Sequence, residues 1–177
     1  MYALPSFAAE RYFSVTPGVW LPYHTSTIYY NLQPINSSYS AGWSLGGAVG
    51  ASFDNGLRIE NELVYRQASA RGMNDDQWNL GWLVNLWWEG RNSTRITPYF
   101  GGGVGFGRGH VASPVSIDNS GSGIAYQAGG GFGYRIHDNV SLDLGYRYFG
   151  ITDSSSNNIG GIELAGSSWV AGLRMRF

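Results

Sequence analysis

The feature that most constrains this chain is a two-residue alternation of large apolar and small or polar side chains, which recurs from residue 13 to the last residue. Successive side chains of a β-strand point to opposite faces, so this period indicates strands. In 78–88, for example, every second residue is Trp, Leu or Val. The alternation predicts eight strands, near residues 11–21, 39–53, 57–66, 77–88, 95–107, 123–136, 140–150 and 167–177.

The connections between these strands alternate in length. The short ones, 54–56, 89–94 and 137–139, contain the Asp, Asn and Gly that tight turns use. The longer ones are rich in Ser, Asn and Gly and cover 22–38, 67–76, 107–122 and 151–166. Short turns at one end and long loops at the other are typical of outer-membrane barrels. We therefore predict one all-β domain over 1–177, an eight-stranded antiparallel up-and-down transmembrane barrel with both termini in the periplasm.

A soluble eight-stranded barrel is the alternative, and it would have to hold the bulky face inside. Eight strands leave an interior barely wide enough for side chains, so the large aromatic residues would overfill it. In lipid the same face can point outward, and closure of the barrel satisfies every backbone donor and acceptor. We expect the following residues to face lipid or to form the interfacial aromatic girdles: Trp43, Trp78, Trp82, Trp88, Tyr134, Tyr146 and Trp169.

Composition excludes several classes of function. Charged residues make up 13% of the chain, about half of the roughly 25% of soluble domains. The net charge is −1 without a basic run, which excludes the usual electrostatics of nucleic-acid binding. Cysteine is absent, so we expect neither a disulfide nor a Cys-based metal site, and no motif predicts a cofactor. Residues 1–9 lack a signal-peptide pattern, so we interpret the chain as a mature form, with Met1 as an expression residue.

Charged residues fall on the face opposite the bulky one. A hairpin centred on Asn55 places Gly50 opposite Glu60 and Ala48 opposite Glu62, so small residues leave room for charged ones. The predicted lumen charges are Arg58, Glu60, Glu62, Arg66, Arg135, Asp143, Arg147, Arg174 and Arg176. We interpret them as an ion-paired plug, with Glu60 and Glu62 ionised beside arginines. The alternative is a narrow channel for polar or anionic solutes.

In the first strand, Pro17 has no backbone donor for the ladder, so we expect a β-bulge there.

Three glycine- and tyrosine-rich segments resemble the opacity-type porin family, which is similar in turn to the OmpA-type transmembrane domain. They are 97–103 (TPYFGGG), 126–131 (YQAGGG) and 143–148 (DLGYRY). The alternating apolar ending with Phe177 looks like the outer-membrane assembly signal. The resemblance implies insertion by the β-barrel assembly machinery into a membrane of phospholipid and lipopolysaccharide. It also implies a structural, adhesive or weakly pore-forming surface protein, with partners at the long loops.

Loop residues leave other chemistry open. The residue types needed for acyl transfer occur at His24, His110, Ser113, Ser116 and Asp118, which makes a lipid-modifying enzyme the other class of function. Nothing fixes a base within reach of a nucleophile, so we expect no enzyme.

A pair of acidic residues and a group of tyrosines also lie in or beside the predicted loops. Asp75 and Asp76 can be read as a weak calcium site or as solvated loop residues, and we expect no metal. Tyr29, Tyr30 and Tyr39 can be read as an adhesive patch or as packing across the barrel mouth.

Overall fold

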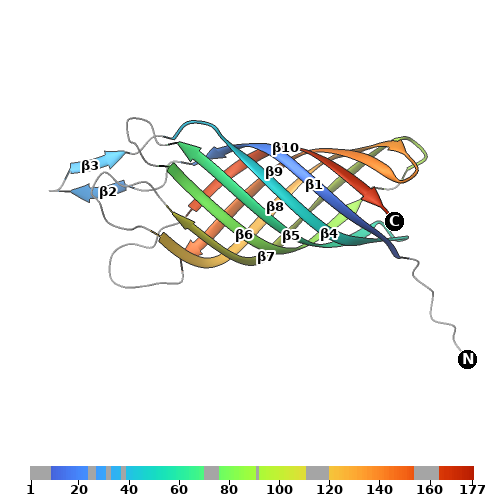
Figure 1. Cartoon of the computed structure of the whole chain (residues 1–177), viewed down its shortest axis with the longest axis horizontal. Helices are drawn as coiled ribbons and strands as arrows, with labels where there is room; N and C mark the ends of the chain where they lie inside the picture. The colour runs from blue at the N-terminus through green and yellow to red at the C-terminus, as the bar shows by residue number, and fades with distance from the viewer. Residues whose placement is uncertain are drawn as a thin grey trace, which may run out of the picture.

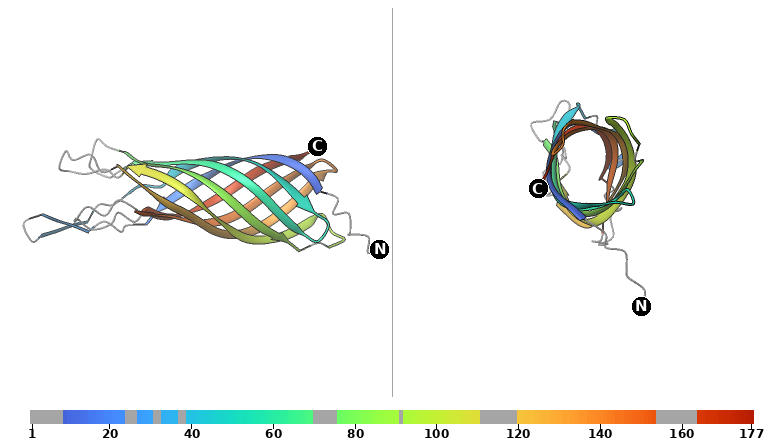
Figure 2. Two further views of the ribbon diagram at one scale, coloured as in Figure 1. Left: turned by 90° about the horizontal axis from the view of Figure 1, so that it is seen from below. Right: turned by 90° about the vertical axis from the view of Figure 1, so that its right-hand side faces the viewer.

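The computed structural model describes residues 9–23, 27–30, 33–36, 39–69, 76–90, 92–110, 120–153 and 164–177. Eight long strands form a closed antiparallel barrel (Figures 1 and 2). They are β1 (Ala9–Pro22), β4 (Gly42–Phe53), β5 (Leu57–Ser69), β6 (Asp76–Glu89), β7 (Ile96–His110), β8 (Ser120–His137), β9 (Val140–Asp153) and β10 (Leu164–Arg176). The predicted fold class is confirmed. No helix within these ranges is long and apolar enough to cross a membrane.

Each strand of the barrel pairs with its neighbour in sequence, and the ring closes where β1 pairs with both β10 and β4. The start of β1, the end of β10 and the short turns lie at one end of the barrel, here called the turn end (Figure 1). The long connections lie at the opposite end, the loop end. At the turn end, Gly56 has a φ of 85°, which a side chain would disfavour, and the Asn55 Oδ1 accepts a hydrogen bond from the Leu57 amide.

Most strands extend further at the loop end than the alternation predicts, whereas β4 begins at Gly42, three residues after its predicted start. β7 continues to His110 and β9 to Asp153, three residues beyond their predicted ends. The backbone ladder continues where the apolar pattern stops, because antiparallel hydrogen bonds do not depend on which side chains cover the sheet. A separate hairpin of β2 (Thr27–Tyr30) and β3 (Gln33–Asn36) lies within the predicted first loop. This hairpin was not predicted from the sequence.

The bulge expected at Pro17 is wrong. Pro17 pairs in regular register with Leu45 of β4. On the β10 side the register is the same before and after the proline, with Val15 opposite Leu173 and Gly18 opposite Val170. The ladder to β10 therefore skips the pairings of Thr16 and Pro17 without an extra residue, which is enough to accommodate the missing donor.

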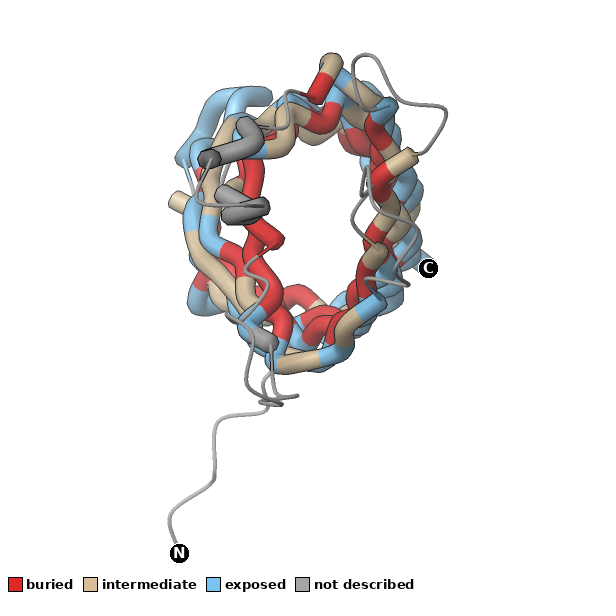
Figure 3. The backbone as a smooth tube through the Cα atoms, turned by 90° about the vertical axis from the view of Figure 1, so that its left-hand side faces the viewer, coloured by how far each residue is buried: buried red, intermediate tan, exposed pale blue. Residues whose placement is uncertain are grey.

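Buried and exposed residues alternate along the strands, and in the axial view they follow each other around the ring (Figure 3). Large apolar side chains lie on the outside: Val49, Phe100 and Phe106 are each at least 60% exposed. Polar and charged side chains are buried inside, together with Trp20 and Trp87, which have no exposed surface. The outer surface is thus apolar, and the interior holds the polar and charged side chains together with an apolar cluster that includes Trp20, Leu83 and Phe149.

Candidate functional site

The candidate site is the lumen, and glycines on the inner face of β7 provide its space. A Cβ at Gly103 would lie 2.0 Å from Oδ1 of Asn85, and a Cβ at Gly101 would lie 2.9 Å from the Trp87 ring. On the other side of β6, the charged residues of β5 lie beside the small residues of β4, with Gly50 opposite Glu60 and Ala48 opposite Glu62 as the hairpin register predicted. Long side chains can therefore cross the barrel.

Glu62 is the centre of the middle layer. Its carboxylate accepts hydrogen bonds from Nη1 of Arg147 at 2.5 Å and from the side-chain amides of Gln127 at 2.5 Å and Asn85 at 2.8 Å. Glu62 and Arg147 are both buried, and they lie on β5 and β9. Because these strands stand on opposite sides of the ring, the pair spans the lumen.

Glu60 lies one step closer to the turn end and is held by neutral donors. The Tyr12 hydroxyl donates to it at 2.7 Å, the Trp87 indole at 2.7 Å and the Asn85 amide at 3.2 Å. Within the described chain no arginine is within ion-pair distance of Glu60, so its predicted pairing with arginine is wrong. Hydrogen-bond donors from β1 and β6 occupy the positions around this carboxylate that a counter-ion would take.

Glu89 organises the layer at the turn end. Its Oε1 accepts from Nη1 of Arg58 at 2.7 Å and from Nη1 of Arg174 at 2.6 Å. Asp143 completes the cluster, 3.1 Å from Nη2 of Arg174 and 3.7 Å from Nη1 of Arg58. Glu89 was expected in the turn 89–94, and its place in the lumen was not predicted. The signal was available, because Glu89 continues the inward odd-numbered series of β6.

Arg66 forms a third layer toward the loop end, and its neighbours are rings. The guanidinium carbon lies 3.7 Å from the Phe149 ring centroid and 5.2 Å from that of Trp20. Within the described chain its side chain donates one hydrogen bond, from Nη1 to Oδ1 of Asn79 at 3.4 Å. No described carboxylate pairs with Arg66, so this cation is held by aromatic faces.

Two of the predicted lumen charges lie elsewhere. Arg135 is exposed at the turn end, where the β8–β9 register shifts, and donates to the Thr94 carbonyl at 3.5 Å. Arg176 lies at the rim and pairs with Glu10 at 3.7 Å. Arg135 and Arg176 are paired at the turn-end edge of the ladder, with Ser141 and Tyr12, and their long side chains donate to the turn carbonyls of Thr94 and Asp138. Within the described strands the lumen charges, Glu89 included, are four arginines and four carboxylates, which balance: Arg58, Arg66, Arg147, Arg174, Glu60, Glu62, Glu89 and Asp143.

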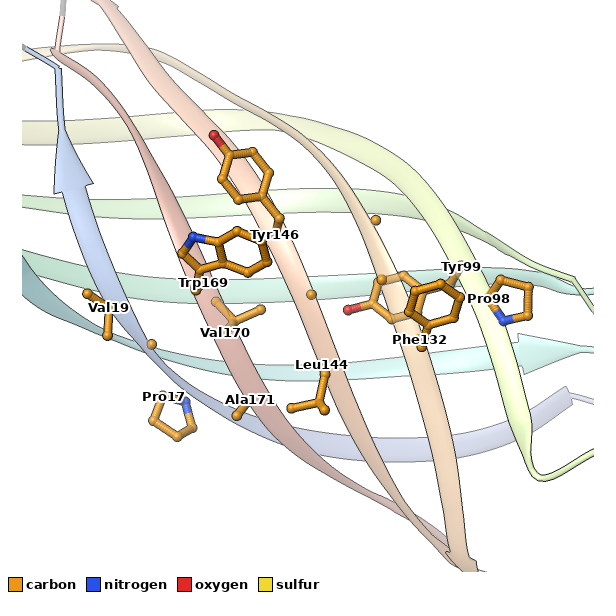
Figure 4. A pocket seen from close by; sticks show the side chains of 14 residues that line it. Pro17, Val19, Pro98, Tyr99, Phe132, Leu144, Tyr146, Trp169, Val170 and Ala171 are labelled. Carbon is orange, nitrogen blue, oxygen red and sulfur yellow. The ribbon is translucent and has the colours of Figure 1, made fainter.

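The expected girdle residues all lie on the outer side of the barrel. Trp43, Trp82, Trp88, Tyr134, Tyr146 and Trp169 are 37–61% exposed, and Trp78 is half-buried between Tyr65 and His110. Phe177, the last residue of the ending that resembles the outer-membrane assembly signal, is 77% exposed. The outer wall also has an apolar trough of about 1070 Å³, bordered by Val19, Trp169, Tyr146 and Phe132 (Figure 4). The apolar side chains that line it are part of the outer apolar surface.

Most of the residues considered for loop chemistry, among them His24, Ser113, Ser116, Asp118 and Asp75, lie outside the described residues. The side chains of Tyr29 and Tyr30 also lie outside them, whereas Tyr39 is buried. His110 stacks on Trp78 and lies 3.4 Å from the Ser120 hydroxyl. The described part of the chain contains no group of three or more residues that could hold a metal.

A closed barrel with an apolar exterior and an ion-paired interior defines a membrane-spanning β-barrel. Residues 2–177 match the outer membrane protein beta-barrel domain family, and the chain belongs to this family. It is therefore an integral protein of the bacterial outer membrane, and its lumen is largely filled by polar and charged side chains.

The chain is similar to other outer-membrane proteins. Outer membrane protein PagN of Salmonella typhimurium is 31% identical over 93 residues, which are 46% of this chain and 39% of PagN. Among solved structures, Neisserial surface protein A aligns with a TM-score of 0.68 and 18% identity over 96% of this chain and 99% of its own. Ail, the attachment invasion locus protein of Yersinia pestis, aligns with a TM-score of 0.55 and 17% identity over 96% and 99%. At these identities the solved structures show the fold alone.

Proposed function

We propose that the protein is a non-conducting, non-enzymatic barrel that anchors the loop end at the cell surface for contact with partners. The observation that carries this proposal is the filled lumen. Side chains of Glu62, Arg147, Gln127 and Asn85 meet across its middle, and each is at most 7% exposed. Ions would have to displace a buried, hydrogen-bonded network, which costs several kcal/mol per ion pair.

Single-channel recording in planar bilayers tests this proposal. We expect the parent barrel to give no steady conductance. The alternative, a narrow channel for polar or anionic solutes, requires a continuous water path. A parent barrel that conducts steadily would establish the channel. The balance of four lumen arginines and four carboxylates gives no basis for anion preference.

The proposed orientation places both termini and the short turns in the periplasm and the loop end outside. An even number of strands returns the chain to its starting side, and long connections face outward in bacterial barrels. Protease added to intact cells should then cut within the long loops. Cleavage at Asn55 or Asp138, which are in short turns, would show that the orientation is the opposite of the proposed one.

Surface contact through 22–38, 67–76, 107–122 and 151–166 follows from this orientation. Ail, which shares the fold, is named for attachment and invasion and has been solved with a heparin analogue. The proposed surroundings are outer-membrane phospholipid and lipopolysaccharide, with insertion by the β-barrel assembly machinery through the ending at Phe177. Deleting single loops and measuring attachment of expressing cells to host cells tests the surface role. If no loop deletion lowers attachment, the surface role is contradicted and a structural role is left.

A further inference from the structure

Asn61 is an exception on the outer face of the barrel. It is exposed on β5 in the middle of the apolar surface, between Ile59 and Leu63 along the strand. Across the ladder it faces Val49 on β4 and Val84 on β6. These four apolar neighbours are 44–60% exposed, so hydrocarbon surrounds the amide on every side.

The Asn61 side chain forms no hydrogen bond within the described chain. Water is absent from the bilayer core, so the two amide protons and the carbonyl oxygen of this side chain are unsatisfied there. In the ladder row through Asn61, the outward residues Phe13, Val49, Val84 and Val104 are apolar, so the amide is no part of a polar surface. The amide therefore requires a hydrogen-bond partner from another molecule.

A hollow of about 380 Å³ lies beside Asn61 on the same face. Gly47, Val49, Leu63 and Trp82 contribute to its lining. A Cβ built on Gly47 would meet nothing within 4 Å, so the glycine is not required by packing within the barrel. Glycine at this position lets another surface approach the sheet closely, as small residues do at contacts between transmembrane segments.

We propose that a second copy of this chain binds here, through a twofold interface centred on Asn61. An asparagine amide is self-complementary, because its donor and acceptor fit those of an identical group in two reciprocal hydrogen bonds. In a twofold dimer the same patch faces itself, and a side chain at the axis meets its own copy. Two barrels with the same orientation share an axis along the membrane normal, which brings the two Asn61 residues together at one depth. The hollow at Gly47 receives an apolar side chain of the other copy.

Self-association in vesicles tests this interface. Because the chain has no cysteine, Ser93→Cys, at an exposed turn-end position, gives one dye site per barrel. Donor- and acceptor-labelled barrels are mixed in dimyristoyl phosphatidylcholine vesicles, and energy transfer is followed as lipid is added. We expect Asn61→Val to weaken association about tenfold, in line with interhelical hydrogen bonds in membranes. Gly47→Leu should weaken it as well by filling the hollow, while a Cβ at this outward position meets nothing within 4 Å in the barrel itself.

Leu144→Val is the matched control. It changes a lipid-facing residue on β9, the strand opposite β5 in the ring, and should leave association at the parent level. Resistance to trypsin and the sheet signal in circular dichroism verify that each variant is folded. A parent barrel without energy transfer above random proximity would overturn the proposal. So would an Asn61→Val variant that associates like the parent, or a Gly47→Leu variant with unchanged association.

A directed cross-link provides a second measurement. In the twofold arrangement, Leu63→Cys places one thiol near its copy, and mild oxidation should give a covalent dimer. The same substitution at Leu144 should give monomers. Equal cross-linking at both positions would indicate random collision and contradict the interface.

Discussion

Glu62→Gln is the perturbation that separates a plugged lumen from a wet one. The substitution removes the negative charge 2.5 Å from Nη1 of Arg147, and Arg147 is 7% exposed. The new amide group also faces donors, since Gln127 and Asn85 both donate to the carboxylate. Removing one partner of a buried ion pair leaves an uncompensated charge and costs about 3–5 kcal/mol. The unfolding equilibrium should therefore shift by roughly two to three and a half orders of magnitude.

Urea unfolding in lipid vesicles, followed by tryptophan fluorescence, measures this loss. The matched control is Glu10→Gln, because Glu10 pairs with Arg176 at 3.7 Å and its side chain is 61% exposed. An exposed pair of this kind contributes about 0–1 kcal/mol. Equal small losses in both variants would refute the reasoning, because they would mean that water screens Arg147 in the lumen. The parent would then be expected to conduct.

Three further outcomes follow from the same structure. Arg66→Leu should change unfolding stability by less than about 1 kcal/mol or increase it, since no described carboxylate loses an ion-pair partner, and urea titration measures this. Gly103→Leu should abolish the folded, heat-modifiable band in gel electrophoresis, because its Cβ would lie 2.0 Å from Oδ1 of Asn85; a normal band would contradict the packing of the lumen. Leu86→Arg, on the outer face, should cost about 2–4 kcal/mol in urea titrations, and a loss near zero would place Leu86 away from the bilayer centre.

Local pattern determined much of this protein. Because side chains alternate along a strand, the position of each residue in the alternation decides its face, and the alternation separated outward Leu86 from inward Asn85. Hairpin registers followed in the same way, since a tight turn fixes which residues are opposite, as with Gly50 and Glu60. Large apolar side chains occupy one face and small or polar ones the other, and this difference in size then determined that the apolar face points to lipid.

Closure of the barrel decided what the alternation could not. Glu62 meets Arg147 across the ring, 85 positions away in sequence, and this meeting depends on strand tilt and stagger. The same closure gave Glu60 neutral donors and placed Arg66 against Phe149. Alternation assigns a residue to the lumen but not to a depth or a partner. Those are set by how far neighbouring strands are displaced around the whole ring, a property that no single hairpin contains.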